Sequence, residues 1–104
     1  MSTINKLAAT IAARASAAPD RSYTSKLLHD GIDKCAKKFG EEAFELALAA
    51  SSENKAHTAQ EAADVIYHLL VLLQASGVSL AEVETVLASR EAQSGLDEKV
   101  GRRG

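Results

Sequence analysis

Two pairs of carboxylate side chains are the residues whose types and spacing point most directly to chemistry. Glu42 and Glu45 are three residues apart, which places them on one face of an α-helix. Glu61 and Asp64 have the same spacing, and Glu41 joins the edge of the first pair. The fifteen residues between the pairs leave room for a helix end, a turn and the start of a second helix. Two antiparallel helices would therefore bring four carboxylates together.

Four converging carboxylates repel one another unless protons or cations neutralise them. Hard oxygen ligands favour Mg²⁺, with Mn²⁺ as a substitute, and the pattern contains no cysteine that would favour zinc. The Glu-x-x-His pairs of di-iron helical bundles are absent from the sequence. The sequence therefore predicts a site for Mg²⁺ or Mn²⁺ where the carboxylates meet.

Two structural explanations compete with this prediction. The run from 41 to 45 can be a solvated helix face, which is the commoner role of an isolated EExxE run. Glu61 can instead complete a capping box that begins at Thr58 and so only cap a helix. Asp64 argues against both, because it is a poor helix former placed directly before the apolar Val65 and Ile66. We favour a shared functional role for the four carboxylates.

Further polar residues lie within one helical turn of the acidic pairs. Lys34, Lys37 and Lys38 precede the first pair, where they can meet phosphate oxygens or form ordinary salt bridges to the neighbouring glutamates. His68 lies one turn beyond Asp64 and is either a partner of a carboxylate or the substrate, or a buried core histidine, which is the commoner case. Cys35 fits a small buried apolar position.

Helices must position these side chains, and the apolar periodicity predicts four of them. They run from residue 4 to about 14, from 22 to about 50, from 55 to 76 and from 80 to about 92. Gly31 should weaken or bend the second helix. Gly77 fits a C-terminal cap, and Ser79 with Glu82 forms a capping box before the last helix. The tail at 94–104 should be mobile or ordered by a partner.

The third predicted helix is apolar nearly all the way round between Val65 and Leu73. It leaves more apolar surface than one short chain easily covers, so we expect an all-α bundle of about four helices per chain that is completed by homodimerisation. A single buried helix inside a monomer is the alternative.

Composition limits the remaining possibilities. A chain of 104 residues fits one domain, and aromatic residues make up only 4% of it. A net charge of -2 lacks the basic excess of a dedicated nucleic-acid binder. One cysteine cannot form an internal disulfide, and the N-terminus lacks the apolar run of a signal peptide or membrane span. We therefore expect a cytoplasmic protein that binds neither nucleic acid nor membrane.

The EExxE and ExxD spacing resembles the all-α nucleoside triphosphate pyrophosphatases, the superfamily that includes MazG proteins and dimeric dUTPases. Within it, the segments SYTSKLL (22–28), KKFGEE (37–42) and EAADVIYHLL (61–70) are similar to the phosphoribosyl-ATP pyrophosphatase family. This resemblance covers nearly the whole chain. It implies a Mg²⁺-dependent homodimer that hydrolyses phosphoribosyl-ATP to phosphoribosyl-AMP and pyrophosphate, the second step of histidine biosynthesis, here in a stand-alone form.

The resemblance also implies roles for individual residues. The metal ligands would be Glu42, Glu45, Glu61 and Asp64. Glu41 would orient or deprotonate the attacking water, in a catalytic group that also contains Glu42 and Glu45. Candidates for substrate contact are Tyr23, Lys26, Lys34, Lys37, Lys38 and His68. The alternatives are a house-cleaning pyrophosphatase for other nucleoside triphosphates and a non-catalytic helical dimerisation module.

Overall fold

The computed structural model describes residues 2–19 and 22–92, so the predicted tail at 94–104 lies outside the described residues. Within these ranges the chain forms five α-helices and no strand, which confirms the all-α prediction. The helices are α1 (Thr3–Arg14), α2 (Tyr23–Asp30), α3 (Ile32–Ser51), α4 (Lys55–Ser76) and α5 (Leu80–Ala92).

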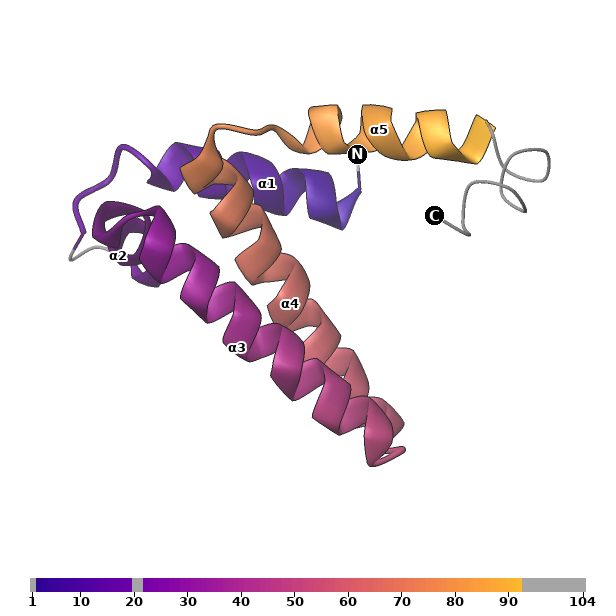
Figure 1. The fold of residues 1–104 in the computed structure, drawn as a ribbon. Helices are drawn as coiled ribbons and strands as arrows, with labels where there is room; N and C mark the ends of the chain where they lie inside the picture. The colour runs from indigo at the N-terminus through magenta and orange to yellow at the C-terminus, as the bar shows by residue number, and fades with distance from the viewer. Residues whose placement is uncertain (1, 20–21, 93–104) are drawn as a thin grey trace.

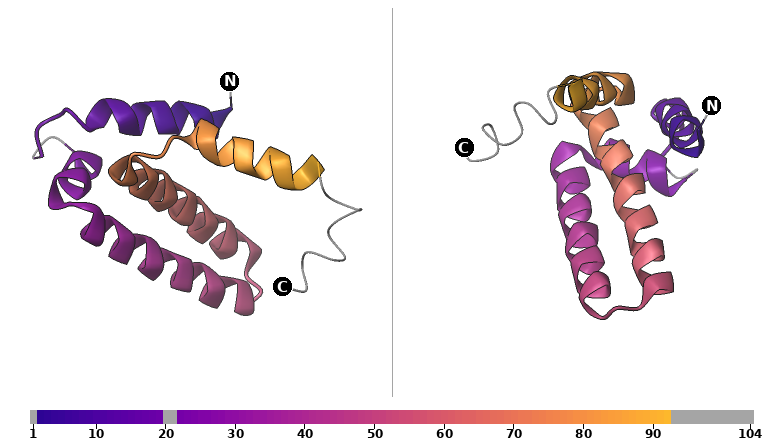
Figure 2. Two further views of the ribbon diagram at one scale, coloured as in Figure 1. Left: turned by 45° about the horizontal axis from the view of Figure 1, so that its top comes forward. Right: turned by 90° about the vertical axis from the view of Figure 1, so that its right-hand side faces the viewer.

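The two longest helices, α3 and α4, lie side by side as an antiparallel hairpin (Figure 1). Helices α1 and α2 pack at the end of the hairpin that is opposite its turn, as the views in Figure 2 show. Helix α5 leaves the end of α4 at an angle of 109°. The hairpin therefore has one end covered by other helices and one end that stands alone.

A break at Gly31 corrects the predicted continuous helix from 22 to about 50. Gly31 has φ +101°, a conformation that residues with a side chain rarely adopt, and its backbone N–H bonds the carbonyl of Leu28. Helix α2 therefore ends at Asp30, and α3 begins at Ile32 in a new direction. The described residues therefore form five helices where the periodicity predicted about four.

The helix ends use the expected capping chemistry. Asn54 caps α4 by accepting a bond from the N–H of His57, so Glu61 lies well inside the helix and the alternative capping box at Thr58 does not form. Gly77 ends α4 in the left-handed conformation. The Ser79 hydroxyl accepts from the Glu82 N–H, and the Glu82 carboxylate accepts from the Ser79 N–H, as predicted.

The hydrophobic core lies at the covered end of the hairpin. It consists of Ile11 from α1, Leu27 from α2, Cys35 from α3, and Leu70 and Val71 from α4. Each of these side chains is at most 4% exposed, so the prediction of a buried Cys35 is confirmed. Burial is the main cause that raises the pKa of the Cys35 thiol, and the charge of Asp30 is the second. The thiol therefore stays protonated and unreactive.

A test of length and hydropathy finds no single helix among the described residues that qualifies as a membrane span. Helices α4 and α5 meet the criteria of length and composition only when they are counted together across the 109° bend between them.

Candidate metal centre

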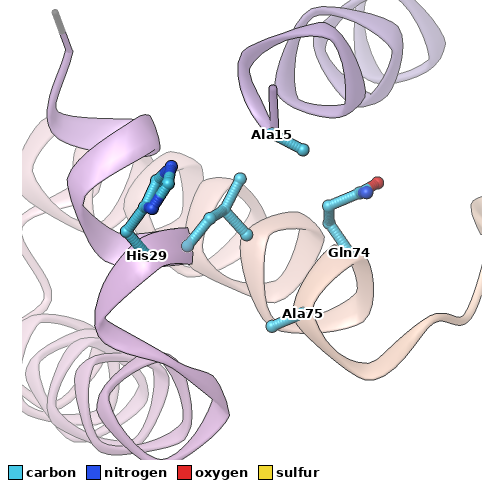
Figure 3. Close-up of a pocket in the computed structure, with 5 residues that line it drawn as sticks. Ala15, His29, Gln74 and Ala75 are labelled. Carbon is cyan, nitrogen blue, oxygen red and sulfur yellow. The ribbon is translucent and has the colours of Figure 1, made fainter. Parts of the chain in front are cut away.

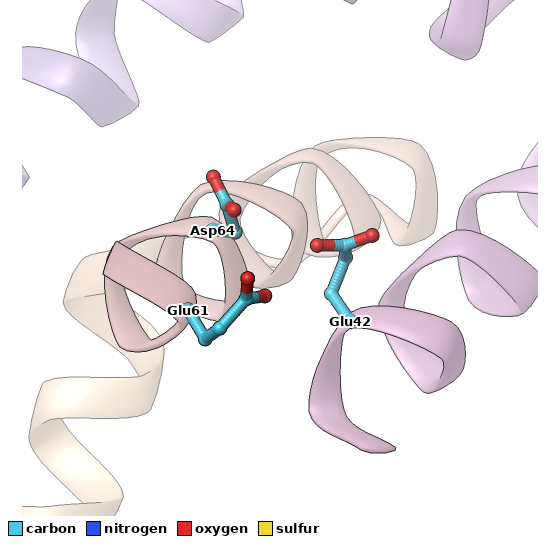
Figure 4. A group of neighbouring side chains, drawn as sticks. All are labelled: Glu42, Glu61 and Asp64. Atoms are coloured by element: carbon cyan, nitrogen blue, oxygen red, sulfur yellow. The ribbon is translucent and has the colours of Figure 1, made fainter. Parts of the chain in front are cut away.

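Three carboxylates from two helices converge near the middle of the hairpin. Glu42 projects from α3, while Glu61 and Asp64 project from successive turns of α4 (Figure 4). One carboxylate oxygen from each of the three lies within 4.8 Å of the others. The predicted convergence across the hairpin is therefore present for these three residues.

The chemistry of this donor set fits a hard divalent cation. Carboxylate oxygens that bind one Mg²⁺ at about 2.1 Å lie at most about 4.2 Å apart, so small side-chain rotations would complete the geometry. The Glu61 side chain is 16% exposed, Glu42 is half-buried and Asp64 is exposed. One side of the site is thus shielded, and the other is open to solvent.

The remaining carboxylates lie outside this group. Glu45 is exposed on the same face of α3 as Glu42, one turn further along. Glu41 is also exposed and pairs with Lys38 at 3.4 Å. Asp64 is exposed as well, although its position before Val65 suggested that the core would be close. The structure therefore unites three of the four predicted ligands.

The lysines differ in their surroundings. Lys38 forms the salt bridge to Glu41 that the sequence offered as one of two roles. The pKa of Lys38 is raised, first by the Tyr23 phenol and then by Glu41 and Glu42. The exposed Lys26 lies 3.5 Å from Asp30. Lys34 and Lys37 are exposed, and neither forms an ion pair with another described residue.

His68 is only 7% exposed and joins α4 to α2. Its Nδ1 lies 2.8 Å from the backbone carbonyl of Asp64, and its Nε2 lies 3.3 Å from the Tyr23 hydroxyl. It is thus a buried core histidine, and the partners of its two ring nitrogens are a backbone carbonyl and a phenol rather than a carboxylate side chain.

Sequence reasoning missed the neighbouring pair of Thr24 and Tyr67, whose hydroxyl groups share a hydrogen bond between α2 and α4. Tyr67 also packs edge-on against His68, with ring centroids 4.9 Å apart. These residues are 43 positions apart, and helical periodicity carries no signal for such a contact. Thr24 follows Tyr23 in the segment 22–28, and Tyr67 precedes His68 in the segment 61–70. This adjacency to predicted site residues is the signal that could have identified the pair.

A separate pocket of about 220 Å³ lies between α2 and the C-terminal half of α4 (Figure 3). Its lining consists of Ala15, Leu28, His29, Gln74 and Ala75. None of these is a predicted site residue, so the pocket plays no part in the metal centre.

Comparisons with known proteins bear on the whole chain. The family described as "Phosphoribosyl-ATP pyrophosphohydrolase" matches residues 4–91. A phosphoribosyl-ATP pyrophosphatase of Cereibacter sphaeroides is 55% identical and aligns over 98% of this chain and 99% of its own. Phosphoribosyl-ATP pyrophosphatase 1 of Rhodopseudomonas palustris is 52% identical over 97% and 94%. A phosphoribosyl-ATP pyrophosphatase of Dinoroseobacter shibae is 54% identical over 98% of this chain and 100% of its own.

Proposed function

The chain belongs to the phosphoribosyl-ATP pyrophosphohydrolase family, and we propose that it performs the reaction of that family at a divalent cation held by Glu42, Glu61 and Asp64. The reaction is the hydrolysis of phosphoribosyl-ATP to phosphoribosyl-AMP and pyrophosphate in histidine biosynthesis. The observation that carries the assignment of the site is the meeting of three carboxylates from two helices within 4.8 Å.

The three carboxylates have a simple task in this reaction. They concentrate negative charge at one point of the hairpin, and this charge selects a divalent cation. A bound Mg²⁺ supplies positive charge that neutralises phosphate oxygens and activates water. Glu45 lies one turn from Glu42 on an exposed face, so a change of its side-chain rotamer would let it join the ligands.

The charged residues beside the metal centre can act on the attacking water and on the departing pyrophosphate. Hydrolysis breaks the bond between the α- and β-phosphates, and the attacking water must lose a proton. Glu41 is an exposed carboxylate at the edge of the centre and is our candidate for orienting that water and accepting its proton. Lys34, Lys37 and Lys38 extend from the same helix and can stabilise the charge of the departing pyrophosphate.

We also propose that a second copy of the chain covers the apolar surface that one copy leaves exposed. Phe44 and Leu48 on α3 are 63% and 51% exposed, and Val86 and Leu87 on α5 are 50% and 56% exposed. Exposed apolar side chains grouped on one helix face favour association. Phe44 and Leu48 follow Glu41 and Glu45 along α3, so the second copy would border the metal centre.

Pyrophosphate release from phosphoribosyl-ATP, measured with Mg²⁺ and again with EDTA, tests the activity and its need for metal. ATP and dCTP serve as competing substrates in parallel reactions. Release from phosphoribosyl-ATP that EDTA abolishes would support the proposal. Release that EDTA leaves unchanged would exclude the metal centre, and a preference for ATP or dCTP would move the chain to the house-cleaning class.

A further inference from the structure

We propose that the exposed ring of Tyr23 is the surface on which the purine base of the substrate stacks, and that Tyr67 and His68 hold this ring beside the metal centre. The inference rests on the proposed function, because it concerns the base of phosphoribosyl-ATP. It adds a contact to the base, whereas the carboxylates and lysines act on the phosphates.

The aromatic group lies next to Asp64 on α4. Tyr67 and His68 follow Asp64 by three and four residues, so the three side chains share one face of the helix. Nδ1 of His68 lies 2.8 Å from the Asp64 carbonyl oxygen, and Nε2 lies 3.3 Å from the Tyr23 hydroxyl. One imidazole ring thus separates that hydroxyl from the backbone of a proposed metal ligand. Only the sugar separates a nucleotide base from its first phosphate, so a nucleotide bound at the metal can reach Tyr23.

Tyr23 is the member of the aromatic group that a ligand can contact. Its ring stacks on Tyr67 with centroids 6.3 Å apart and an angle of 20° between the planes, and it meets the His68 ring edge-on at 6.0 Å. Tyr67 is half-buried and His68 is 7% exposed, whereas Tyr23 is 51% exposed. Phe44, the other strongly exposed aromatic side chain among the described residues, stacks on no second ring.

Hydrogen bonds on both sides of this group fix the ring before a ligand binds. The Asp64 carbonyl oxygen can only accept, so Nδ1 of His68 donates to it and Nε2 accepts from the Tyr23 hydroxyl. Thr24, the next residue of α2, shares a hydrogen bond with the Tyr67 hydroxyl. A ring that is already held in place loses little conformational entropy when a base stacks on it, which favours affinity.

The same hydrogen bonds favour a base over a phosphate as the partner of Tyr23. A phenol has one proton, and the Tyr23 hydroxyl donates it to His68. Phosphate oxygens accept hydrogen bonds, so this hydroxyl has no donor left for them. Stacking needs only the flat face of the ring, and every base has a π-face that can meet it.

The two products of the reaction separate contact with the base from contact with phosphate. Phosphoribosyl-AMP contains the purine, and pyrophosphate does not. We expect Tyr23→Leu, which keeps apolar bulk but removes the flat ring, to weaken inhibition by phosphoribosyl-AMP about tenfold. Inhibition by pyrophosphate should be little changed. Tyr23→Phe keeps the ring and is the matched control, so inhibition by either product should stay within about threefold of the wild type.

Three outcomes of this comparison would overturn the proposal. Equal weakening of both products in Tyr23→Leu would mean that the change disturbs the centre as a whole. Unchanged inhibition by phosphoribosyl-AMP would mean that Tyr23 does not contact the base. Equal losses in Tyr23→Leu and Tyr23→Phe would assign the effect to the hydroxyl instead of the ring.

The proton resonances of the Tyr23 ring in the wild-type chain give a readout that depends neither on turnover nor on the folding of a variant. The chain has two tyrosines, and comparison with Tyr23→Phe assigns their signals. Phosphoribosyl-AMP with Mg²⁺ should shift the Tyr23 signals upfield through the ring current of the base. Ribose 5-phosphate, which lacks the base, should not.

Equal shifts from phosphoribosyl-AMP and ribose 5-phosphate, or no shift at saturating phosphoribosyl-AMP, would overturn the base contact. Pyrophosphate release from phosphoribosyl-ATP would still support the proposed function in that case. If the wild-type chain showed the base-dependent shift but released no pyrophosphate, the proposed function would fail while the base contact stood.

Discussion

The two ends of the α3–α4 hairpin differ in how much of their apolar surface the chain itself covers. At the end near α1 and α2, five core side chains are at most 4% exposed. Towards the turn, Ala49 is the buried apolar residue of α3, while Phe44 and Leu48 are 63% and 51% exposed. The covered end stabilises the fold, and the bare end carries the apolar surface that we propose a second copy covers.

The carboxylate centre lies between these two ends. Glu42 is near the middle of α3, and Glu61 and Asp64 occupy the turn-side half of α4. The covered end fixes the relative position of the helices, and the bare end leaves the carboxylates exposed on one side. The proposed metal centre therefore occupies a position that neither end could provide alone.

The largest expected effect comes from the centre itself. Asp64→Asn and Glu61→Gln should each reduce turnover by about 10²-fold to 10³-fold, because a metal ligand contributes several kcal/mol to the transition state. Helical content and Tm should change little, since carboxylate repulsion is relieved. Glu84→Gln removes an exposed carboxylate from α5 and serves as the control. Full activity in both site variants would exclude the centre.

A matched pair of leucines measures the difference between the two ends. Leu70→Ala, at the covered end, should lower the free energy of unfolding by about 2–5 kcal/mol because it leaves a cavity. Leu48→Ala, at the bare end, should cost under about 0.5 kcal/mol at protein concentrations where the chain is monomeric. Urea denaturation gives both values. Equal losses in the monomer would mean that the two ends are equally packed.

Phe44 tests what covers the bare end. Phe44→Asp places a charge in the exposed apolar surface of α3 and should convert a dimer to a monomer, as seen by light scattering after size-exclusion chromatography. Ala13→Asp adds the same charge at an exposed position of α1 and should leave the mass unchanged. A wild-type chain that is monomeric at micromolar concentration would contradict the proposed second copy.

The sequence predicted where helices begin and end better than it predicted the contacts between helices. The caps at Gly77 and Ser79 depend on residues within one turn, and both are present. The predicted continuous helix was wrong at Gly31, because a glycine can either bend a helix or end it, and packing of the separate helices decides between the two.

At the candidate site, too, the sequence predicted positions along a helix better than side-chain contacts. Spacing along each helix predicted the meeting of Glu42, Glu61 and Asp64. It did not predict that Glu45 lies outside the group, because rotamers of exposed side chains have no periodic signal. The contact of Tyr23 with His68 spans 45 positions and depends on the break at Gly31, which redirects α2 across α4.

The smallest expected effect concerns the start of α5, beyond the covered end. Two bonds with Ser79 lower the pKa of the exposed Glu82 carboxyl, so its stabilising effect is present above the unfolded pKa of about 4.5. That effect is lost as the pH falls through the lower folded pKa. Glu82→Ala should lower Tm slightly at pH 7, and the difference from wild type should vanish at strongly acidic pH.

Glu82→Gln separates the hydrogen bonds of this cap from its charge, because glutamine can also complete a capping box. Its Tm should lie near that of the wild type at pH 7 and should not show the same loss on acidification. If Glu82→Gln loses as much Tm on acidification as the wild type does, the acid sensitivity arises from groups outside the α5 cap. The start of α5 would then contribute to stability through its hydrogen bonds alone.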